Sequence, residues 1–164
     1  MAQADDLRAL SRLLRRQADG KDRLKAMRAE LRTAAAPMVP AVRSAIRAIP
    51  NSSTTQRSRA GRRRPTMRAS LARAVTLQVR TGGKRAGVAL FMNPRKMPDG
   101  LKAMPAYFEG TPGYQRFRHP VFGADVWVTQ RPHPYFTRTV RSADRQLTRV
   151  VDEIIERIRR EVEG

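Results

Sequence analysis

The chain contains no cysteine and few aromatic residues, with one Trp, three Tyr and five Phe among 164 residues. Without cysteine there can be no disulfide framework, no thiolate zinc site and no cysteine nucleophile. No stretch approaches the roughly 18 apolar residues of a membrane helix, and the N-terminus is acidic and polar where a secretory signal would be basic and then apolar. We therefore expect a chain that folds in the cytoplasm and neither enters a membrane nor is secreted.

Carboxylates are absent from residues 31 to 98, a span that carries 15 of the 34 Lys and Arg residues. The net charge of the whole chain is +20. Because ion pairs within the chain cannot neutralise so long a positive span, we expect a negatively charged counterpart, which could be nucleic acid, an acidic protein ring or counterions. Arg outnumbers Lys 29 to 5, a bias that fits bidentate phosphate contacts and equally fits a GC-rich genome.

Helical periodicity marks both ends of a chain whose length fits a single domain. Residues 4 to 18 place leucines at three- and four-residue spacing and predict an amphipathic helix. Residues 21 to 49 predict a second helix that Pro37 and Pro40 kink or divide, since each proline removes a backbone donor and clashes with the preceding turn. The recurring Val, Leu and Ile of residues 137 to 162 predict a long C-terminal helix. The N-terminal helices thus occupy residues 1–49 and the C-terminal helix residues 137–164.

Residues 67 to 136 are expected to hold the sheet and its hairpins. After a short helix over 67 to 74, residues 75 to 81 alternate apolar and polar side chains, and Gly82-Gly83 signals a turn to a partner strand over 86 to 92. We expect a loop over residues 93 to 105, a helical turn over residues 106 to 110, and a third strand or second hairpin over residues 121 to 130. We therefore predict an α+β fold with helices on one face of a small antiparallel sheet of three to four strands.

Residues 50 to 66 are predicted to form an extended basic arm. The segment has no apolar periodicity and carries five arginines, so it cannot bury enough surface to stay ordered alone. A flexible basic arm can follow a phosphate backbone without reading bases, and it can equally contact a neighbouring protein or remain a solvated loop without a specific role. The candidate DNA or partner contacts are the arginines in and just after the arm: Arg57, Arg59, Arg62, Arg63, Arg64 and Arg68.

No catalytic, cofactor or metal site is expected. The Gly-Gly-Lys of residues 82 to 84 lacks the full phosphate-loop spacing, which leaves a hairpin turn as the better interpretation. His119 and His133 each adjoin a proline, and no Cys or spaced carboxylate completes a metal shell. Asp125 lies in a turn and Glu109 beside a glycine, so they form no obvious acid–base pair, and no nucleophile elbow is present. The sequence therefore predicts a protein that is not an enzyme.

Residues 118 to 136 have the most specified order in the chain. They read Arg-His-Pro-Val-Phe-Gly-Ala-Asp-Val-Trp-Val-Thr-Gln-Arg-Pro-His-Pro-Tyr-Phe and hold the only Trp, both His and three of the eleven Pro. A β-forming Val-Trp-Val after a turn, ended by prolines, predicts a rigid hairpin with an aromatic tip. Stacking platforms for single strands are an alternative role for its aromatic residues. The candidate core or subunit-interface anchors here and just upstream are Tyr107, Phe108, Phe122, Trp127, Tyr135 and Phe136.

This segment, the Pro-Ala-Tyr-Phe-Glu-Gly of residues 105 to 110 and the charged helix downstream together resemble the tail-completion and head-tail joining (neck) proteins of long-tailed bacteriophages. The resemblance is clearest from about Met97 to the C-terminal helix, extends to the strands of residues 75 to 92, and is only general for the N-terminal helices. It implies a structural virion protein at the head-tail junction, made in the host cytoplasm, without cofactor or membrane.

The resemblance also implies partners. A ring subunit would repeat one heterologous interface until the ring closes, with six or twelve copies around the DNA channel. The basic arm and the hairpin would reach the adjacent subunit or the adjacent neck and tail proteins, and contact with packaged DNA would be non-specific. The alternative function is a sequence-independent nucleic-acid binding protein that uses the arm, although no helix-turn-helix, zinc or RNA-binding signature accompanies the charge.

The alternative function predicts a salt dependence. If the five arm arginines each neutralise one phosphate, the logarithm of the affinity for duplex DNA should fall against the logarithm of salt concentration with a slope of about 4 to 5. Substituting these arginines by Gln should remove that part of the slope in an anisotropy titration. Binding that is flat in salt, or unchanged by the substitutions, counts against the arm.

Overall fold

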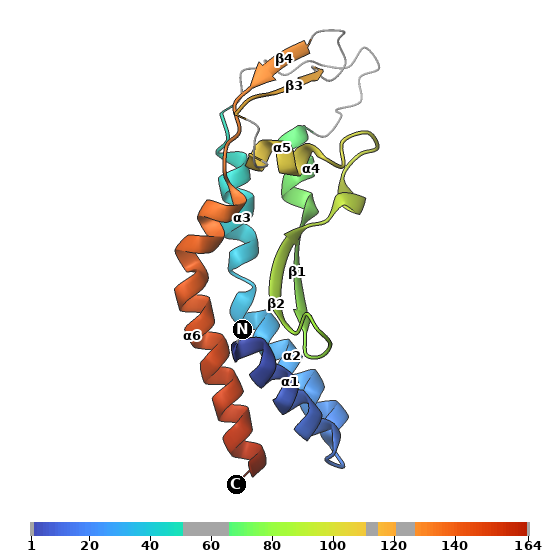
Figure 1. The fold of residues 1–164 in the computed structure, drawn as a ribbon, viewed down its shortest axis with the longest axis vertical. Coiled ribbons are helices and arrows are strands. Elements are labelled where there is room, and N and C mark those ends of the chain that lie inside the picture. The colour runs from blue at the N-terminus through green and yellow to red at the C-terminus, as the bar shows by residue number, and fades with distance from the viewer. Residues whose placement is uncertain (1, 51–65, 111–114, 121–126, 164) are drawn as a thin grey trace. The chain divides into compact units, whose positions relative to one another are not determined.

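The computed structural model describes residues 2–50, 66–110, 115–120 and 127–163 (Figure 1). The chain divides into two compact units. Unit 1 consists of Met1–Pro40, Thr76–Phe91 and Arg141–Gly164, and unit 2 consists of Ala41–Val75 and Met92–Val140. Both helices and strands are present, which confirms the predicted α+β class.

The core of unit 1 forms where the apolar stripes of three helices meet. They are α1 (Ala2–Arg15), α2 (Gly20–Ala35) and the part of α6 (Phe136–Glu163) that belongs to this unit. Their leucine, isoleucine and valine side chains recur at the three- and four-residue spacing that puts them on one helix face. The buried cluster comprises Leu7, Leu10, Leu14, Leu24, Met27, Leu31, Ala86, Val151, Ile154, Ile155 and Ile158. The helices predicted from residues 4 and 137 are thus confirmed, with ends shifted by one to three residues.

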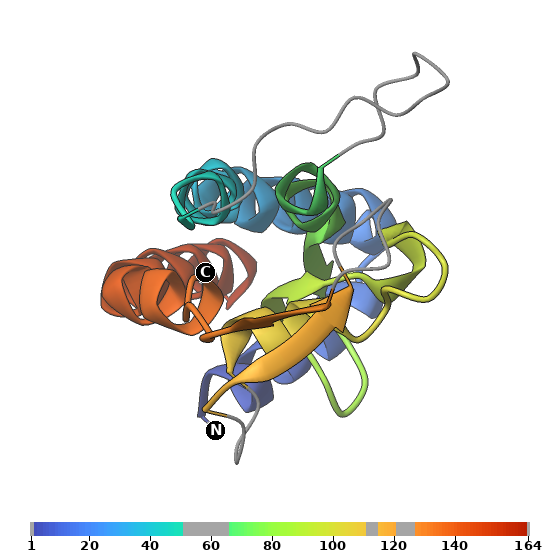
Figure 2. The same ribbon diagram turned by 90° about the horizontal axis from the view of Figure 1, so that it is seen from above.

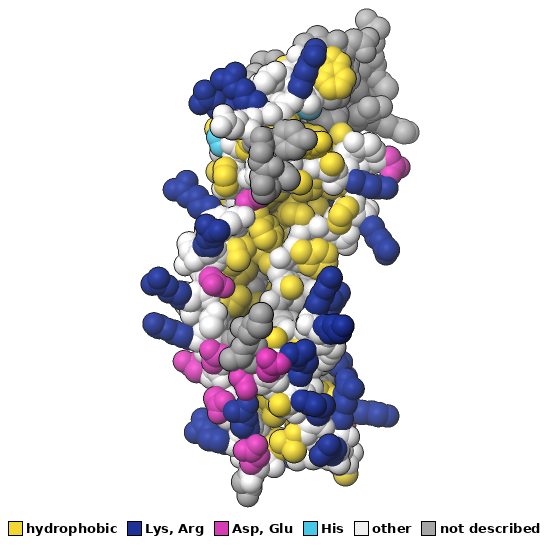
Figure 3. All heavy atoms as spheres, viewed as in Figure 1, with side chains coloured by type: hydrophobic (Ala, Val, Ile, Leu, Met, Phe, Trp, Pro, Cys, Tyr) yellow, Lys and Arg dark blue, Asp and Glu magenta, His cyan; other side chains and the backbone are white. Residues whose placement is uncertain are grey.

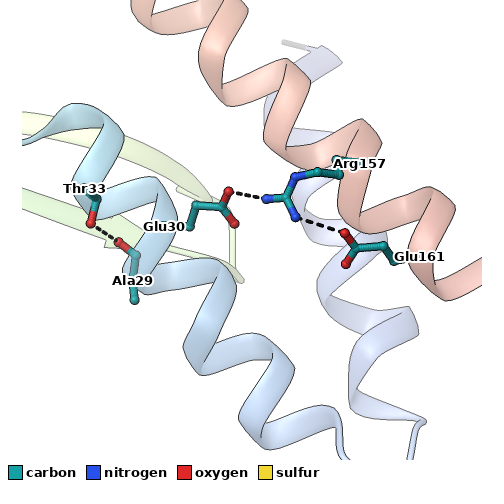
Figure 4. A network of polar contacts seen from close by, with 5 residues as sticks. All are labelled: Ala29, Glu30, Thr33, Arg157 and Glu161. Carbon is teal, nitrogen blue, oxygen red and sulfur yellow. Dashed lines mark hydrogen bonds and ion pairs between the residues drawn. The ribbon is translucent and has the colours of Figure 1, made fainter.

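Ion pairs on the surface of unit 1 join α6 to the N-terminal helices. The Arg157 guanidinium binds the Glu30 carboxylate of α2 and, one turn along α6, the Glu161 carboxylate at 3.0 Å (Figure 4). Arg159 reaches Asp6 of α1 at 3.4 Å. These pairs lie at the surface and are at least partly solvent-exposed, so they contribute little to stability and chiefly favour one pairing of the helices.

Pro37 divides the second predicted helix, as the sequence indicates. Helix α2 ends at Ala35, and α3 (Met38–Arg47) begins after the proline. Pro40 is the third residue of α3, where its missing N–H costs no bond within the helix. The kink-or-divide prediction is therefore confirmed as a division at residues 36 and 37.

The strands form two separate two-stranded sheets, not the single sheet of three to four strands that the sequence predicts. Strands β1 (Val75–Arg80) and β2 (Gly87–Met92) pair as one antiparallel hairpin, and β3 (Phe117–Pro120) pairs with β4 (Trp127–Gln130). The two hairpins pack against apolar side chains of different units. Val79 and Val88 pack on the helix cluster of unit 1, whereas the β3–β4 hairpin lies over α5 (Met104–Glu109) in unit 2, as Figures 1 and 2 show.

The helices of unit 2 are linked by bonds to backbone carbonyls. Helix α4 (Met67–Ala74) is capped by Thr66, whose hydroxyl accepts from the Ala69 N–H at 3.2 Å. Arg43 of α3 donates to the Ala72 carbonyl at 3.0 Å, which ties α3 to α4. The short 3-10 helix η1 (Pro94–Lys96) follows β2, and the Asn93 N–H just before it donates to the Ala74 carbonyl at 2.8 Å.

The turn between α1 and α2 generates a stability prediction. A Cβ atom at Gly20 would lie 1.9 Å from the Leu14 carbonyl oxygen, so Gly20→Ala must displace the backbone of this turn. We expect a loss of about 2 to 3 kcal/mol in the free energy of unfolding, measured by urea denaturation.

The matched control is Gly82→Ala, the same substitution in the same unit. There the nearest atom to a Cβ would be a flexible arginine nitrogen at 3.4 Å, so stability should stay the same or rise slightly. Equal effects of the two substitutions would show that the close approach at Gly20 does not exist in solution.

Candidate interaction surface

The β3–β4 hairpin has two chemically different faces. Its antiparallel register sets Phe117 opposite Gln130 and Pro120 opposite Trp127. Since directly paired residues share a face and alternate residues switch face, one face comprises Phe117, His119, Val128 and Gln130. The other comprises Arg118, Trp127 and Thr129. The first set is buried or half-buried and the second is exposed, which defines an inner and an outer face.

Aromatic rings hold the inner face on α5. The Phe117 ring lies 5.2 Å from the Phe108 ring, edge to face, and 5.8 Å from the Tyr107 ring in a stacked arrangement. Phe108 and Phe117 are both only 5% exposed, and such ring pairs add about 0.5 to 1.5 kcal/mol each beyond burial. His119 stacks on Phe117 at 5.5 Å, and its Nε2 lies 3.0 Å from the Gln130 Oε1 across the strands. The strand pair is therefore positioned by side chains of α5.

The Glu109 carboxylate, at the end of α5, caps the start of α6. One oxygen accepts from the Tyr135 N–H at 3.2 Å and the Phe136 N–H at 2.8 Å, and the other accepts from the Thr137 N–H at 2.7 Å. The first N–H groups of a helix have no partner inside the helix, and the helix dipole favours a negative charge at this end. Glu109 thus satisfies three backbone donors with one side chain.

Further contacts fix the segment between β4 and α6 on α5. The His133 N–H donates to the Phe108 carbonyl at 2.8 Å, and the Tyr135 hydroxyl donates to the Pro105 carbonyl at 3.4 Å. Burial and then the charge of Glu109 raise the pKa of Tyr135, so the phenol stays protonated as a donor. Gly110 ends α5 at a φ of 86°, and a Cβ there would lie 3.1 Å from the Pro132 side chain. Both sides of the hairpin are therefore anchored to one short helix.

The outer face presents the only tryptophan to solvent. Trp127 is 56% exposed, although large apolar side chains are usually buried. The Arg118 guanidinium lies 5.3 Å from the centre of the Trp127 ring, a cation–π contact worth about 0.5 to 1 kcal/mol at an exposed site. Trp127 and Arg118 therefore lie together on a strand pair that the inner-face contacts hold in place.

The structure divides the predicted anchors into three groups. Phe108 and Tyr135 are buried in unit 2, so they are core residues, and Tyr107 and Phe136 are half-buried beside them. Trp127 is not a core residue of this chain, which leaves a subunit interface or a stacking platform as the predicted roles for it. Phe122 lies outside the described residues.

Of the predicted arginine contacts, the structure describes Arg68 alone. Its Nη1 donates to the Arg47 carbonyl at 3.1 Å and to the Ile49 carbonyl at 2.8 Å, so it satisfies the open carbonyls at the C-terminal end of α3. Arg68 therefore has a structural role that the sequence does not indicate. The other predicted contacts lie outside the described residues: Arg57, Arg59, Arg62, Arg63 and Arg64.

Sequence reasoning missed the role of Glu109, for which only an indirect signal exists. A 28-residue helix begins after Tyr135, yet this position lacks the Ser, Thr, Asp or Asn that usually caps a helix. An uncapped start calls for an acceptor from elsewhere in the chain to satisfy the first N–H groups of the helix. The glycine after Glu109 and the prolines before Tyr135 do not by themselves identify Glu109 as that partner.

Within the described ranges, no group of three His, Cys, Asp or Glu residues is arranged to hold a metal ion. No helix in those ranges is both long and apolar enough to cross a membrane. No family model, curated protein or solved structure matches this chain.

The Glu109 cap yields a local prediction. Glu109→Gln keeps the size of the side chain but loses the charge and one accepting oxygen. Amide hydrogen exchange at Phe136 and Thr137 should accelerate by roughly 10-fold, equivalent to about 1.4 kcal/mol, when followed by NMR. Glu153→Gln, on the exposed surface of α6, is the control and should change neither amide. Unaltered exchange in Glu109→Gln would exclude the cap.

Proposed function

We propose that this chain is a structural subunit of the neck of a long-tailed bacteriophage, where it completes the tail or joins head to tail as one copy of a closed ring around the DNA channel. The observation that carries the proposal is the outer face of the β3–β4 hairpin. This face lies within the segment whose order resembles the neck proteins, and it presents Trp127 and Arg118 to solvent.

The chemistry of the outer face supports contact with a protein. Tryptophan and arginine are enriched at the energetic centres of protein interfaces. Tryptophan covers a large area with few rotatable bonds, and arginine forms several directed hydrogen bonds. Burial of the Trp127 ring by a partner would remove its apolar surface from water and so stabilise the complex. The outer face therefore fits a docking strand in a subunit interface.

The rigidity of the hairpin supports the same proposal. Ordering a loop on binding opposes association, and a segment already fixed in its bound shape avoids that cost. Here the inner-face aromatics, the Glu109 cap and the backbone bond from His133 to Phe108 fix both strands on α5. A ring of identical subunits needs such a defined surface, because each copy must repeat the same contact for the ring to close.

The charge of unit 2 favours the second candidate function, nucleic-acid binding without sequence preference. Unit 2 holds 16 Lys and Arg residues and three carboxylates. Two of these carboxylates already have partners, because Glu109 caps α6 and Asp99 lies 3.4 Å from the Lys102 ammonium. The third, Asp125, lies outside the described residues. An excess of this size attracts a polyanion from outside the chain.

The deciding experiment deletes the gene in the phage or prophage that carries it and images the induced lysate by electron microscopy. We expect separate filled heads and unattached tails, because a missing neck ring leaves the two parts unjoined. Normal, infectious particles would refute the neck function and leave the nucleic-acid candidate.

Complementation of that deletion isolates the outer face. Trp127→Ala should fold, since the ring is exposed, yet should lower the yield of joined particles by at least about 10-fold. Thr129→Ala, on the same face, is the matched control and should restore joining. Phe117→Ala should instead lose about 3 to 5 kcal/mol of stability, measured by denaturation, because its ring is in the core. Full joining by Trp127→Ala would remove the outer face from the interface.

A further inference from the structure

The turn between β1 and β2 lies against both N-terminal helices of unit 1. The Arg28 Nε of α2 donates to the Thr81 hydroxyl at 3.0 Å, and Thr81 is only 2% exposed. The Arg15 Nη2 of α1 lies 3.4 Å from the position that a Cβ would take at Gly82. Residues far apart in the sequence therefore meet at this turn.

Four cationic side chains gather at the turn, and we name them the turn patch: Arg15, Arg28, Lys84 and Arg85. All four are exposed, and among the described residues none of them forms an ion pair. Figure 3 shows Lys and Arg side chains crowded over this part of unit 1. In contrast, Arg157 and Arg159 of the same unit each bind two carboxylates. The cations of the turn patch thus repel one another without an internal counterion.

The backbone of the turn is also open. Gly83 has a φ of 77°, and no atom lies within 4 Å of the position of a Cβ there. The Ala86 N–H closes the turn on the Gly83 carbonyl at 3.3 Å. Because neither Gly82 nor Gly83 carries a side chain, a ligand can approach the main chain closely between the flanking cations.

We propose that the turn patch binds the phosphate backbone of duplex nucleic acid without reading its bases. Arginine forks match phosphate oxygens in bidentate geometry, and Lys84 adds a mobile point charge. The patch projects from a turn and two helix surfaces and contains no aromatic or branched apolar side chain of the kind that anchors a protein interface. Contacts of this kind go to phosphate, and they position a protein on a duplex without conferring sequence preference.

This site is distinct from the basic arm of residues 50 to 66 and from the outer face of the β3–β4 hairpin. It depends on unit 1 alone and does not require that the chain be part of a virus particle. Each cation should displace about one counterion from the duplex, so binding should be moderate, additive and steeply dependent on salt.

The experiment measures binding of the full-length chain to a fluorescein-labelled 30-base-pair duplex of random sequence by anisotropy, from about 50 to 300 mM NaCl. The test variant is R15Q/K84Q/R85Q, which keeps the bond from Arg28 to Thr81. The control variant is R141Q/R145Q/R149Q, which removes three exposed charges from α6 in the same unit and so has the same net charge. Circular dichroism checks that both variants fold.

We expect the test variant to lower the slope of log affinity against log salt by about 2 to 3 units, since each phosphate contact contributes about 0.9. Its affinity near 100 mM salt should fall by at least about 10-fold, and the control should change the slope by less than about 1 unit. No binding by the wild type, or equal losses in the two variants, would overturn the proposal. Poly-glutamate that competes as well as unlabelled duplex at equal charge would overturn the assignment to phosphate.

Discussion

The contact between Glu109 and the first amides of α6 is the interaction on which the arrangement of unit 2 depends. It joins residues up to 28 positions apart in the sequence, and the whole β3–β4 hairpin lies in the chain between them. Because the carboxylate ends α5 and caps α6, both ends of the hairpin segment are held at one place. The cost of closing that loop is offset by three charge-assisted bonds and by the rings packed beneath β3.

This anchoring explains how an exposed tryptophan can be useful rather than merely tolerated. On a mobile loop, Trp127 could fold back onto any apolar surface. On β4 its direction is set by the strand register, because the inner face is occupied by Phe117 and His119 packing toward α5. The ring and the Arg118 guanidinium above it therefore point outward together, and a partner would meet them already in place.

Local patterns predicted the helices and the β1–β2 hairpin well, but β3 lies upstream of the strand or hairpin expected over residues 121 to 130. Contacts between distant segments did not follow from local patterns. The leucine spacing of α1, the break at Pro37 and the Gly82-Gly83 turn each depend on a few neighbouring residues, and the structure has all three. Whether Trp127 is buried could not be decided from the sequence, because Trp127 and Val128 lie on opposite faces of the four-residue strand β4. The contact with α5 determines which of these faces is the inner one. The caps formed by Glu109 and Arg68 come from other elements, so no local pattern contains them.

Several of the chain's carboxylates make contacts that fix its structure. Glu30 and Asp6 bind arginines of α6, Glu109 caps that helix in unit 2, and Asp99 is paired with a lysine. Cations left without such partners, as at the β1–β2 turn, repel one another and have no carboxylate among the described residues to offset that repulsion. Their retention on ordered backbone is explained if an external polyanion supplies the missing charge. Phosphates spaced regularly along a duplex would supply that charge without requiring a pocket.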